Sequence, residues 1–326
     1  MAARVRVPAR REPGRQGRDR GRLVATLDEV AAPQRRTKRK LTGYWLILPG
    51  AIWLLVFFVV PFYSLVASSL FDPDGSVLTG YEMTWHVGNY WDAFDQYKGQ
   101  LGRSLLYAGI ATALCLVIGY VLAYAIAFKA GRWKNLMLVL VIAPFFTSFL
   151  LRTLSWKLIL ADDGWVVGVA QAIHLTDLLN LVGLTTTDDR LLATPFAVIA
   201  GLTYNFLPFM VLPLYASLEK VDVRLIEAAG DLYASPMRGF FKVTFPLSLP
   251  GVVAGTLLTF IPAAGDYVNA QLLGSTNTKM IGNSIQSLFT TQLDYATAGA
   301  LSVILMVIIV AAVMAYVRTA GTEELV

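Results

Sequence analysis

Cysteine, histidine and charged residues are all scarce in this chain of 326 residues. Cys115 is the single cysteine and lies within an apolar stretch, which excludes a disulfide framework and a cysteine metal site. The two histidines, His86 and His174, are far apart and lack the spacing of a zinc-binding HExxH motif. Only 15% of the residues are charged, whereas an average soluble domain has about a quarter. These shortages argue against a disulfide-rich secreted protein and against a metalloenzyme.

Hydrophobic residues, in contrast, make up 56% of the chain and are gathered in long runs. A helix needs about 20 apolar residues to cross a bilayer, at a rise of about 1.5 Å per residue. Six runs have about this length or more: 44–70, 104–128, 135–158, 191–218, 247–265 and 296–317. The sequence therefore predicts an all-α, polytopic membrane protein with six transmembrane helices.

Lysine and arginine are distributed unevenly between the segments that join these runs. Residues 1–42 contain 13 of the 27 basic residues and almost no aromatic residue. This composition is typical of a disordered tail, although a nucleic-acid-binding arm or a lipid anchor would also be basic. With the tail in the cytoplasm, six spans place 21 of the 27 basic residues on the same side. Because cytoplasmic loops are enriched in Lys and Arg, we expect a multi-pass protein of the plasma (cytoplasmic) membrane with both termini cytoplasmic.

Residues 221–245 stand out because they are polar and helix-prone, yet they connect two apolar runs. Four apolar residues recur there at helical spacing and form a stripe along one face: Leu225, Ala228, Ala229 and Leu232. Ser235 and Pro236 then indicate a new helix start, with serine as the N-cap and proline at the first helical position. We expect a helix–turn–helix across the membrane surface, either as a docking element for a soluble partner or as an ordinary interfacial helix.

This segment, called the elbow below, resembles the EAA loop of ABC-importer permeases, the element that docks onto the ATPase subunit. Glu227-Ala228-Ala229 and Pro246 match the family pattern, while its isoleucine and leucine are replaced by Val243 and Phe245. Tyr233 stands where the family has glycine, and tyrosine does not readily adopt the left-handed turn that glycine permits. We therefore expect the elbow to turn elsewhere, at Ala234-Ser235. The resemblance implies that the ATPase-coupling residues are Glu227, Ala228, Ala229, Asp231, Tyr233, Ser235 and Phe240.

Other parts of the chain resemble the polyamine permeases of the same superfamily. These parts are Pro144 to Thr153, Tyr204 to Tyr215, Ile261 to Val268, Leu272 to Gly274 and Met280 to Asn283. From about residue 42 to 318 the chain thus resembles the spermidine/putrescine permease family. The resemblance implies an ABC type I importer permease fold for residues 43–318, flanked by the basic tail 1–42 and a cytoplasmic C-terminal tail, 319–326.

The resemblance also implies a transport subunit with no catalytic residue, cofactor or metal of its own. The chain lacks the phosphate-binding motif GxxxxGK[ST], so ATP and Mg²⁺ are expected to bind to a dimer of partner ABC ATPases. The other expected partners are a second homologous permease subunit, an extracytoplasmic substrate-binding protein, a polyamine substrate and the lipid bilayer, but no nucleic acid. Nucleotide bound to the ATPases is then expected to drive alternating access by biasing two states of the pathway.

Candidate residues for the substrate pathway lie in the fourth and fifth apolar runs. Asp266 follows the helix-breaking Pro262 and Gly265, and a carboxylate near membrane depth is a functional candidate because burying it is costly. The alternative is that Asp266 only ends its span at the headgroups. Aromatic faces and polar groups suit ammonium groups through cation–π contacts, which adds four candidates: Tyr204, Asn205, Phe209 and Tyr267.

Other classes of function fit the sequence less well. A membrane enzyme would need a cluster of catalytic or metal-binding side chains within the spans, and no histidine lies in any predicted span. An ion-coupled secondary transporter has no use for an ATPase-coupling elbow. Within the importer class, related permeases handle iron, thiamine and aminophosphonate, so another cationic or small polar solute is the alternative substrate.

Overall fold

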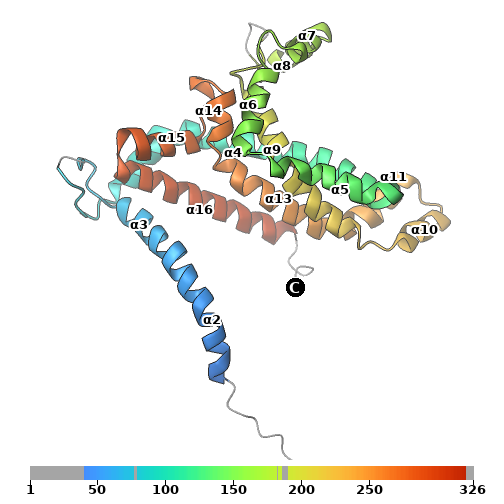
Figure 1. The fold of residues 1–326 in the computed structure, drawn as a ribbon, viewed down its shortest axis with the longest axis horizontal. Helices are drawn as coiled ribbons and strands as arrows, with labels where there is room; N and C mark the ends of the chain where they lie inside the picture. Colours follow the sequence, from blue (N-terminus) through green and yellow to red (C-terminus); the bar gives the residue numbers. More distant parts are fainter. Residues whose placement is uncertain (1–39, 77–78, 182, 186–189, 321–326) are drawn as a thin grey trace, which may run out of the picture. The chain divides into compact units, whose positions relative to one another are not determined.

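The computed structural model describes residues 40–76, 79–181, 183–185 and 190–320. Helices account for nearly all the regular structure of these residues, and their β pairing is limited to two isolated bridges, Phe71 with Met83 and Ser76 with Gly80. The all-α prediction is confirmed (Figure 1). Most of the predicted tail 1–42 and of the C-terminal tail 319–326 lies outside the described residues.

The chain divides into two compact units, and the first ends at Pro61. Its described part consists of α2 (Lys40–Leu54), a π-helical turn (Leu55–Val59) and the first residues of α3 (Val60–Ser68). Residues 46–68 are long and apolar enough to cross a membrane, in agreement with the span predicted at 44–70. Successive apolar side chains are exposed on every side of this helix, as expected where lipid or another membrane helix surrounds it.

The second unit is built on three long helices that pack against one another: α4 (Gly88–Tyr124), α9 (Pro195–Leu218) and α13 (Leu249–Ala264). The C-terminal helix α16 (Tyr295–Ala320) packs beside α4 and α13 (Figure 1). Most of α9 is buried, whereas only 11% of the apolar window of α16 is buried. Helix α4 begins at Gly88, whereas the predicted apolar run begins at residue 104. The sequence analysis missed the first turns because they are polar and do not stand out in a hydropathy pattern.

Shorter helices connect the long ones. Between α4 and α9 lie α5 (Lys134–Ile142), α6 (Phe149–Ile159), α7 (Trp165–Ala172) and α8 (Leu175–Leu181). The elbow contains α10 (Val223–Asp231), α11 (Pro236–Gly239) and a π-helical turn (Phe240–Thr244), and α12 (Phe245–Leu247) begins at the last residue of the elbow. Beyond α13 are α14 (Val268–Leu273) and α15 (Ile281–Ser287). Single turns of 3-10 or π helix occupy Ala125–Lys129, Gly131–Trp133, Ala143–Phe146, Thr276–Thr278 and Leu288–Gln292.

The third predicted span is bent within its length, and the fifth meets the helical segment before it at an angle. Gly131–Phe146 meets α6 at 95°, and Pro236–Leu247 meets α13 at 65°. Four helices in the described residues are long enough to cross a membrane alone, and there are six spans if each bent pair counts as one. The sharper bend follows Pro144, where Thr147 is extended and its Oγ1 donates to the Pro144 carbonyl oxygen at 2.7 Å. The predicted number of spans is retained, but the third is not one continuous helix.

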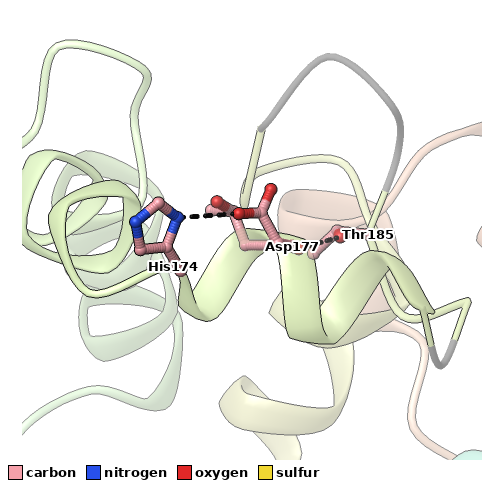
Figure 2. Close-up of polar contacts among 4 residues, drawn as sticks. His174, Asp177 and Thr185 are labelled. Atoms are coloured by element: carbon pink, nitrogen blue, oxygen red, sulfur yellow. Dashed lines mark hydrogen bonds and ion pairs between the residues drawn. The ribbon is translucent and has the colours of Figure 1, made fainter.

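Helices α7 and α8 form a short hairpin between α6 and α9. The hairpin turns at His174, whose φ of +55° is left-handed, and His174 Nδ1 lies 2.9 Å from Asp177 Oδ2 (Figure 2). Thr185 Oγ1 donates to the Thr176 carbonyl oxygen at 3.4 Å, which ties down the segment after α8. Both members of the His174–Asp177 pair are largely exposed, so the pair contributes little to stability.

Close contact between α9 and α13 depends on glycine. A Cβ atom at Gly251 would lie 2.6 Å from Ser217 Cβ and 2.7 Å from the Pro213 carbonyl oxygen. A Cβ atom at Gly255 would lie 2.7 Å from Met210 Sδ. Small residues at such positions let membrane helices approach backbone to backbone, where lipid provides no hydrophobic drive for association.

The close contact predicts opposite effects for two glycine substitutions. Gly251→Ala is expected to lower the free energy of unfolding by about 1–3 kcal/mol, because overpacking forces α9 and α13 apart. Gly109→Ala in α4 is the matched control, since no atom lies within 4 Å of a Cβ there and alanine favours a helix by about 0.5–1 kcal/mol. Thermal unfolding of the purified subunit measures both variants. Equal midpoints would show that this contact does not limit stability.

Candidate functional site

The elbow forms the two helices that the sequence predicts. Asp222 caps α10, with its Oδ1 accepting the Arg224 backbone N–H at 2.9 Å. Ser235 caps α11 by accepting the Arg238 backbone N–H at 3.4 Å, and Pro236 occupies the first helical position. Each helix therefore starts where its own local sequence specifies.

The turn between the two helices is at Tyr233, so the predicted turn at Ala234-Ser235 is wrong. Tyr233 has a left-handed φ of +58°. Its N–H donates to the Gly230 carbonyl oxygen at 2.9 Å, and the Ala234 N–H donates to the Ala229 carbonyl oxygen at 3.0 Å. These two bonds are those of a Schellman motif, in which glycine usually occupies the left-handed position. Tyrosine adopts the conformation despite its Cβ because the turn satisfies the last carbonyls of α10.

Tyr233→Gly is therefore expected to be tolerated and to stabilise the elbow by up to about 1 kcal/mol. Removing the Cβ relieves the left-handed strain, while the greater freedom of glycine in the unfolded chain offsets part of the gain. Thermal unfolding of the purified subunit tests this. The Tyr233 side chain is 96% exposed, so Tyr233→Phe, which retains the strain, is the control. A lower midpoint for Tyr233→Gly would show that the tyrosine ring stabilises the permease.

The outer face of the elbow is apolar and acidic, and the described part of the chain leaves it uncovered. Glu227, Ala228 and Asp231 are exposed, and neither carboxylate has an ion-pair partner among the described residues. Large apolar side chains are exposed around them: Val223, Leu225, Leu232, Tyr233, Met237 and Phe241. A hollow of about 570 Å³ lies beside this face, between the end of α9, α10 and the start of α13. Such an exposed apolar surface suits a partner protein or the lipid headgroups.

Phe240 fastens the elbow to the helical core. Its ring centroid lies 5.4 Å from that of Tyr120 and 6.2 Å from that of Tyr124, both on α4. Phe245 packs against the same ring, and Tyr120 Oη hydrogen-bonds Ser248 Oγ at 2.8 Å. Among the predicted coupling residues, Phe240 is thus the one that points inward and joins the elbow to the spans.

Asp266 lies just beyond α13, at the end farthest from the elbow, and is only 8% exposed. One carboxylate oxygen accepts the Asn269 backbone N–H at 2.9 Å, and both accept from Asn269 Nδ2 at 3.2 Å. Burial raises the pKa of this carboxyl to about 6, and the hydrogen bonds from Asn269 oppose the rise. The Asp266 carboxylate thus anchors the start of α14 through Asn269.

Asn269 connects Asp266 to two other helices. Its Oδ1 accepts from Asn205 Nδ2 on α9 at 3.0 Å. It also lies 3.4 Å from Thr153 Oγ1 on α6, whose single proton is shared with the Phe149 carbonyl oxygen at 3.1 Å. Asn205 Nδ2 also donates to Thr153 Oγ1 at 3.2 Å. All four side chains are buried. The structure therefore joins two predicted pathway residues, Asp266 and Asn205, through Asn269 and Thr153, which the sequence analysis did not single out.

The three aromatic candidates lie in other surroundings. Tyr204 packs against Trp156, with ring centroids 5.6 Å apart, and lines a largely apolar hollow of about 520 Å³. Phe209 packs edge-on against Phe145 at 4.9 Å. Tyr267 is half-exposed, and its carbonyl oxygen accepts from Asn283 Nδ2 at 2.8 Å. The predicted pathway residues therefore do not form one cluster.

The bundle of long apolar helices and the uncovered elbow define a helical membrane protein with an exposed docking candidate. Residues 115–320 match the family model described as "binding-protein-dependent transport system inner membrane component". The chain belongs to this family.

Two permease proteins are similar in sequence over most of the chain. The spermidine/putrescine transport system permease protein PotB of Haemophilus influenzae is 37% identical over 82% of this chain and 90% of its own length. The PotB protein of Escherichia coli K12 is 36% identical over 82% and 93%. A chain from a bacterial ABC transporter involved in the import of the acidic polysaccharide alginate shares the fold, with a TM-score of 0.64 and 16% identity over 88% of this chain and 97% of that one.

Proposed function

We propose that this chain is a permease subunit of an ATP-driven, binding-protein-dependent importer of polyamines such as spermidine and putrescine. The proposal is supported by 36–37% identity to PotB proteins over most of the chain, together with the uncovered elbow. The chain supplies the pathway through the membrane, while a dimer of partner ATPases binds ATP and Mg²⁺. A second permease subunit and an extracytoplasmic binding protein complete the complex. The termini and the elbow face the cytoplasm.

In this proposal the elbow is the ATPase-docking element. Glu227, Asp231 and the exposed apolar side chains around them contact the ATPase, and Phe240 passes the movement on to α4. Two states of the pathway then exchange, and nucleotide on the ATPases biases their populations. Because Phe240 is packed against two tyrosines of one long helix, the elbow and that helix are expected to move together.

Pathway contacts are proposed at the aromatic candidates Tyr204, Phe209 and Tyr267, whose rings suit ammonium groups through cation–π contacts. Asp266 and Asn205 are proposed to serve the pathway from within the bundle. The hydrogen bonds that the Asp266 carboxylate accepts from Asn269 favour a positioning role over direct pairing with a substrate cation.

Transport by the whole complex tests the proposal. Proteoliposomes containing this chain, the second permease subunit and the ATPases are supplied with the binding protein and radiolabelled spermidine. We expect the accumulation of labelled spermidine to require both ATP and the binding protein. We also expect unlabelled putrescine to reduce this accumulation by competition. Competition by thiamine or ferric iron, but not by putrescine, would show that the substrate belongs to another class of solute. Accumulation driven by an ion gradient without ATP would contradict the importer mechanism.

A further inference from the structure

We propose that Thr153, Asn205 and Asn269 form a buried polar lock that holds α14 against α6 and α9, and that this lock must open during each transport cycle. Asp266 positions the lock by orienting Asn269. The inference rests on the proposed alternating-access function. These residues hold the bundle closed at the end of α13 that is opposite the elbow.

The first support is the enclosure of these groups. Thr153 and Asn269 are fully buried, Asn205 is 1% exposed, and all three belong to different helices. Within an apolar bundle, hydrogen bonds between side chains are stronger than in water, and each group that loses its partner is costly. The network therefore favours one arrangement of the three helices over others that packing alone would allow.

The second support is the way Asp266 sets the orientation of Asn269. An ionised carboxylate only accepts hydrogen bonds, so the Asn269 NH2 group must face Asp266. The Asn269 carbonyl oxygen is then directed toward the amide donor of Asn205 and lies beside the Thr153 hydroxyl. An amide in place of the carboxylate would offer donors as well as an acceptor, and this orientation would no longer be imposed.

The third support is the close seating of α14 on α9. A Cβ atom at Gly201 would lie 2.8 Å from Asn269 Oδ1 and 2.5 Å from Leu273 Cδ1. The Ala193 N–H also donates to the Leu273 carbonyl oxygen at 2.9 Å. Helix α14 has six residues and follows the break after α13, so these contacts, more than its own helical stability, hold it in place.

The lock is also incomplete, as expected of a contact that must open. Asn205 Oδ1 is buried and has no hydrogen-bond partner among the described residues. An unsatisfied buried acceptor makes the closed arrangement less stable than a complete network would. Opening therefore gives up fewer interactions, and the acceptor becomes free to find a donor in the other state.

The lock lies at the end of α13 that is opposite the elbow, about 24 Å away for a helix of 16 residues. In the proposed cycle the ATPases close on ATP as this end of the bundle opens. Because coupling between two sites is reciprocal, loosening the lock then favours the closed, hydrolysing state of the ATPases. We therefore expect variants of the lock to hydrolyse ATP in the absence of the binding protein.

ATP hydrolysis by the whole reconstituted complex, measured without binding protein and without substrate, tests this inference. Thr153→Val keeps the shape of the side chain but removes its hydroxyl, and Asn205→Leu removes the amide at similar volume. Each is expected to raise the basal rate about fivefold, as the loss of one net hydrogen bond predicts. Thr153→Ser retains the hydroxyl and is expected to keep the basal rate of the wild-type complex. Unchanged basal rates in both Thr153→Val and Asn205→Leu would overturn the lock.

Asp266→Asn separates positioning from substrate pairing. If Asp266 positions the lock, Asp266→Asn raises the basal rate of ATP hydrolysis and leaves the KM for spermidine within about twofold of the wild-type value. An unchanged basal rate together with a KM raised tenfold or more would assign Asp266 to the substrate and overturn its positioning role. Failure of the wild-type complex to transport spermidine would refute the proposed substrate. The test of the lock by the basal rates of the Thr153 and Asn205 variants would still stand, because those measurements use no substrate.

Discussion

Glu227→Lys is expected to abolish polyamine uptake and to release the ATPase from the complex, while the permease is still inserted in the membrane. Glu227 is exposed on the outer face of the elbow and has no ion-pair partner among the described residues. Reversing the charge in a docked interface places it against a like charge of the partner, and such a juxtaposition costs several kcal/mol. A loss of about 3 kcal/mol weakens binding more than a hundredfold.

Co-purification of the ATPase with a tagged permease, followed by uptake in the same preparation, measures the effect. Glu227→Gln removes the charge without reversing it and is expected to lose less. Asp92→Lys is the matched control, since Asp92 is an exposed carboxylate on α4, outside the elbow. Normal recovery of the ATPase with wild-type uptake in Glu227→Lys would show that the ATPase does not dock through this residue.

Phe240→Ala is expected to leave the ATPase bound but to uncouple it from transport. Its ring packs against Tyr120 and Tyr124 of α4 and against Phe245, so its removal detaches the elbow from the helix that it would move. Truncation of a fully buried phenylalanine costs about 3–5 kcal/mol, and this half-buried ring is expected to lie at or below the lower end. We expect uptake per ATP hydrolysed to fall at least tenfold.

The neighbouring ring provides the control for this experiment. Phe241 is 59% exposed, so Phe241→Ala leaves the core intact and removes a side chain that is available to the ATPase. It is expected to weaken co-purification while the coupling of the remaining complexes stays normal. If Phe240→Ala lost the ATPase and kept the wild-type ratio of uptake to hydrolysis, Phe240 would belong to the docking surface and not to the connection with α4.

Several features of the site followed directly from the sequence because they depend on residues close together in the chain. The apolar runs predicted the spans, since crossing a bilayer requires a helix with apolar side chains all around. Helical spacing predicted α10, and Ser235-Pro236 predicted the start of α11, because an N-cap acts within one turn. The exposure of Glu227 and Asp231 agrees with the polar side of the same pattern.

Other features required the tertiary structure, because they depend on residues far apart in the chain. Thr153 and Asn269 are separated by 116 positions, and no local pattern indicates that their side chains meet. The contact of Phe240 with Tyr120 is equally distant, so the sequence alone did not reveal that this ring points inward. Tyr233 shows the same limit within one turn: its intrinsic preference argued against a left-handed φ, but the Schellman hydrogen bonds outweigh that cost. Local sequence thus specified where most apolar helices and helix starts lie, whereas the break in the third span and the pairing of buried polar groups depended on tertiary packing.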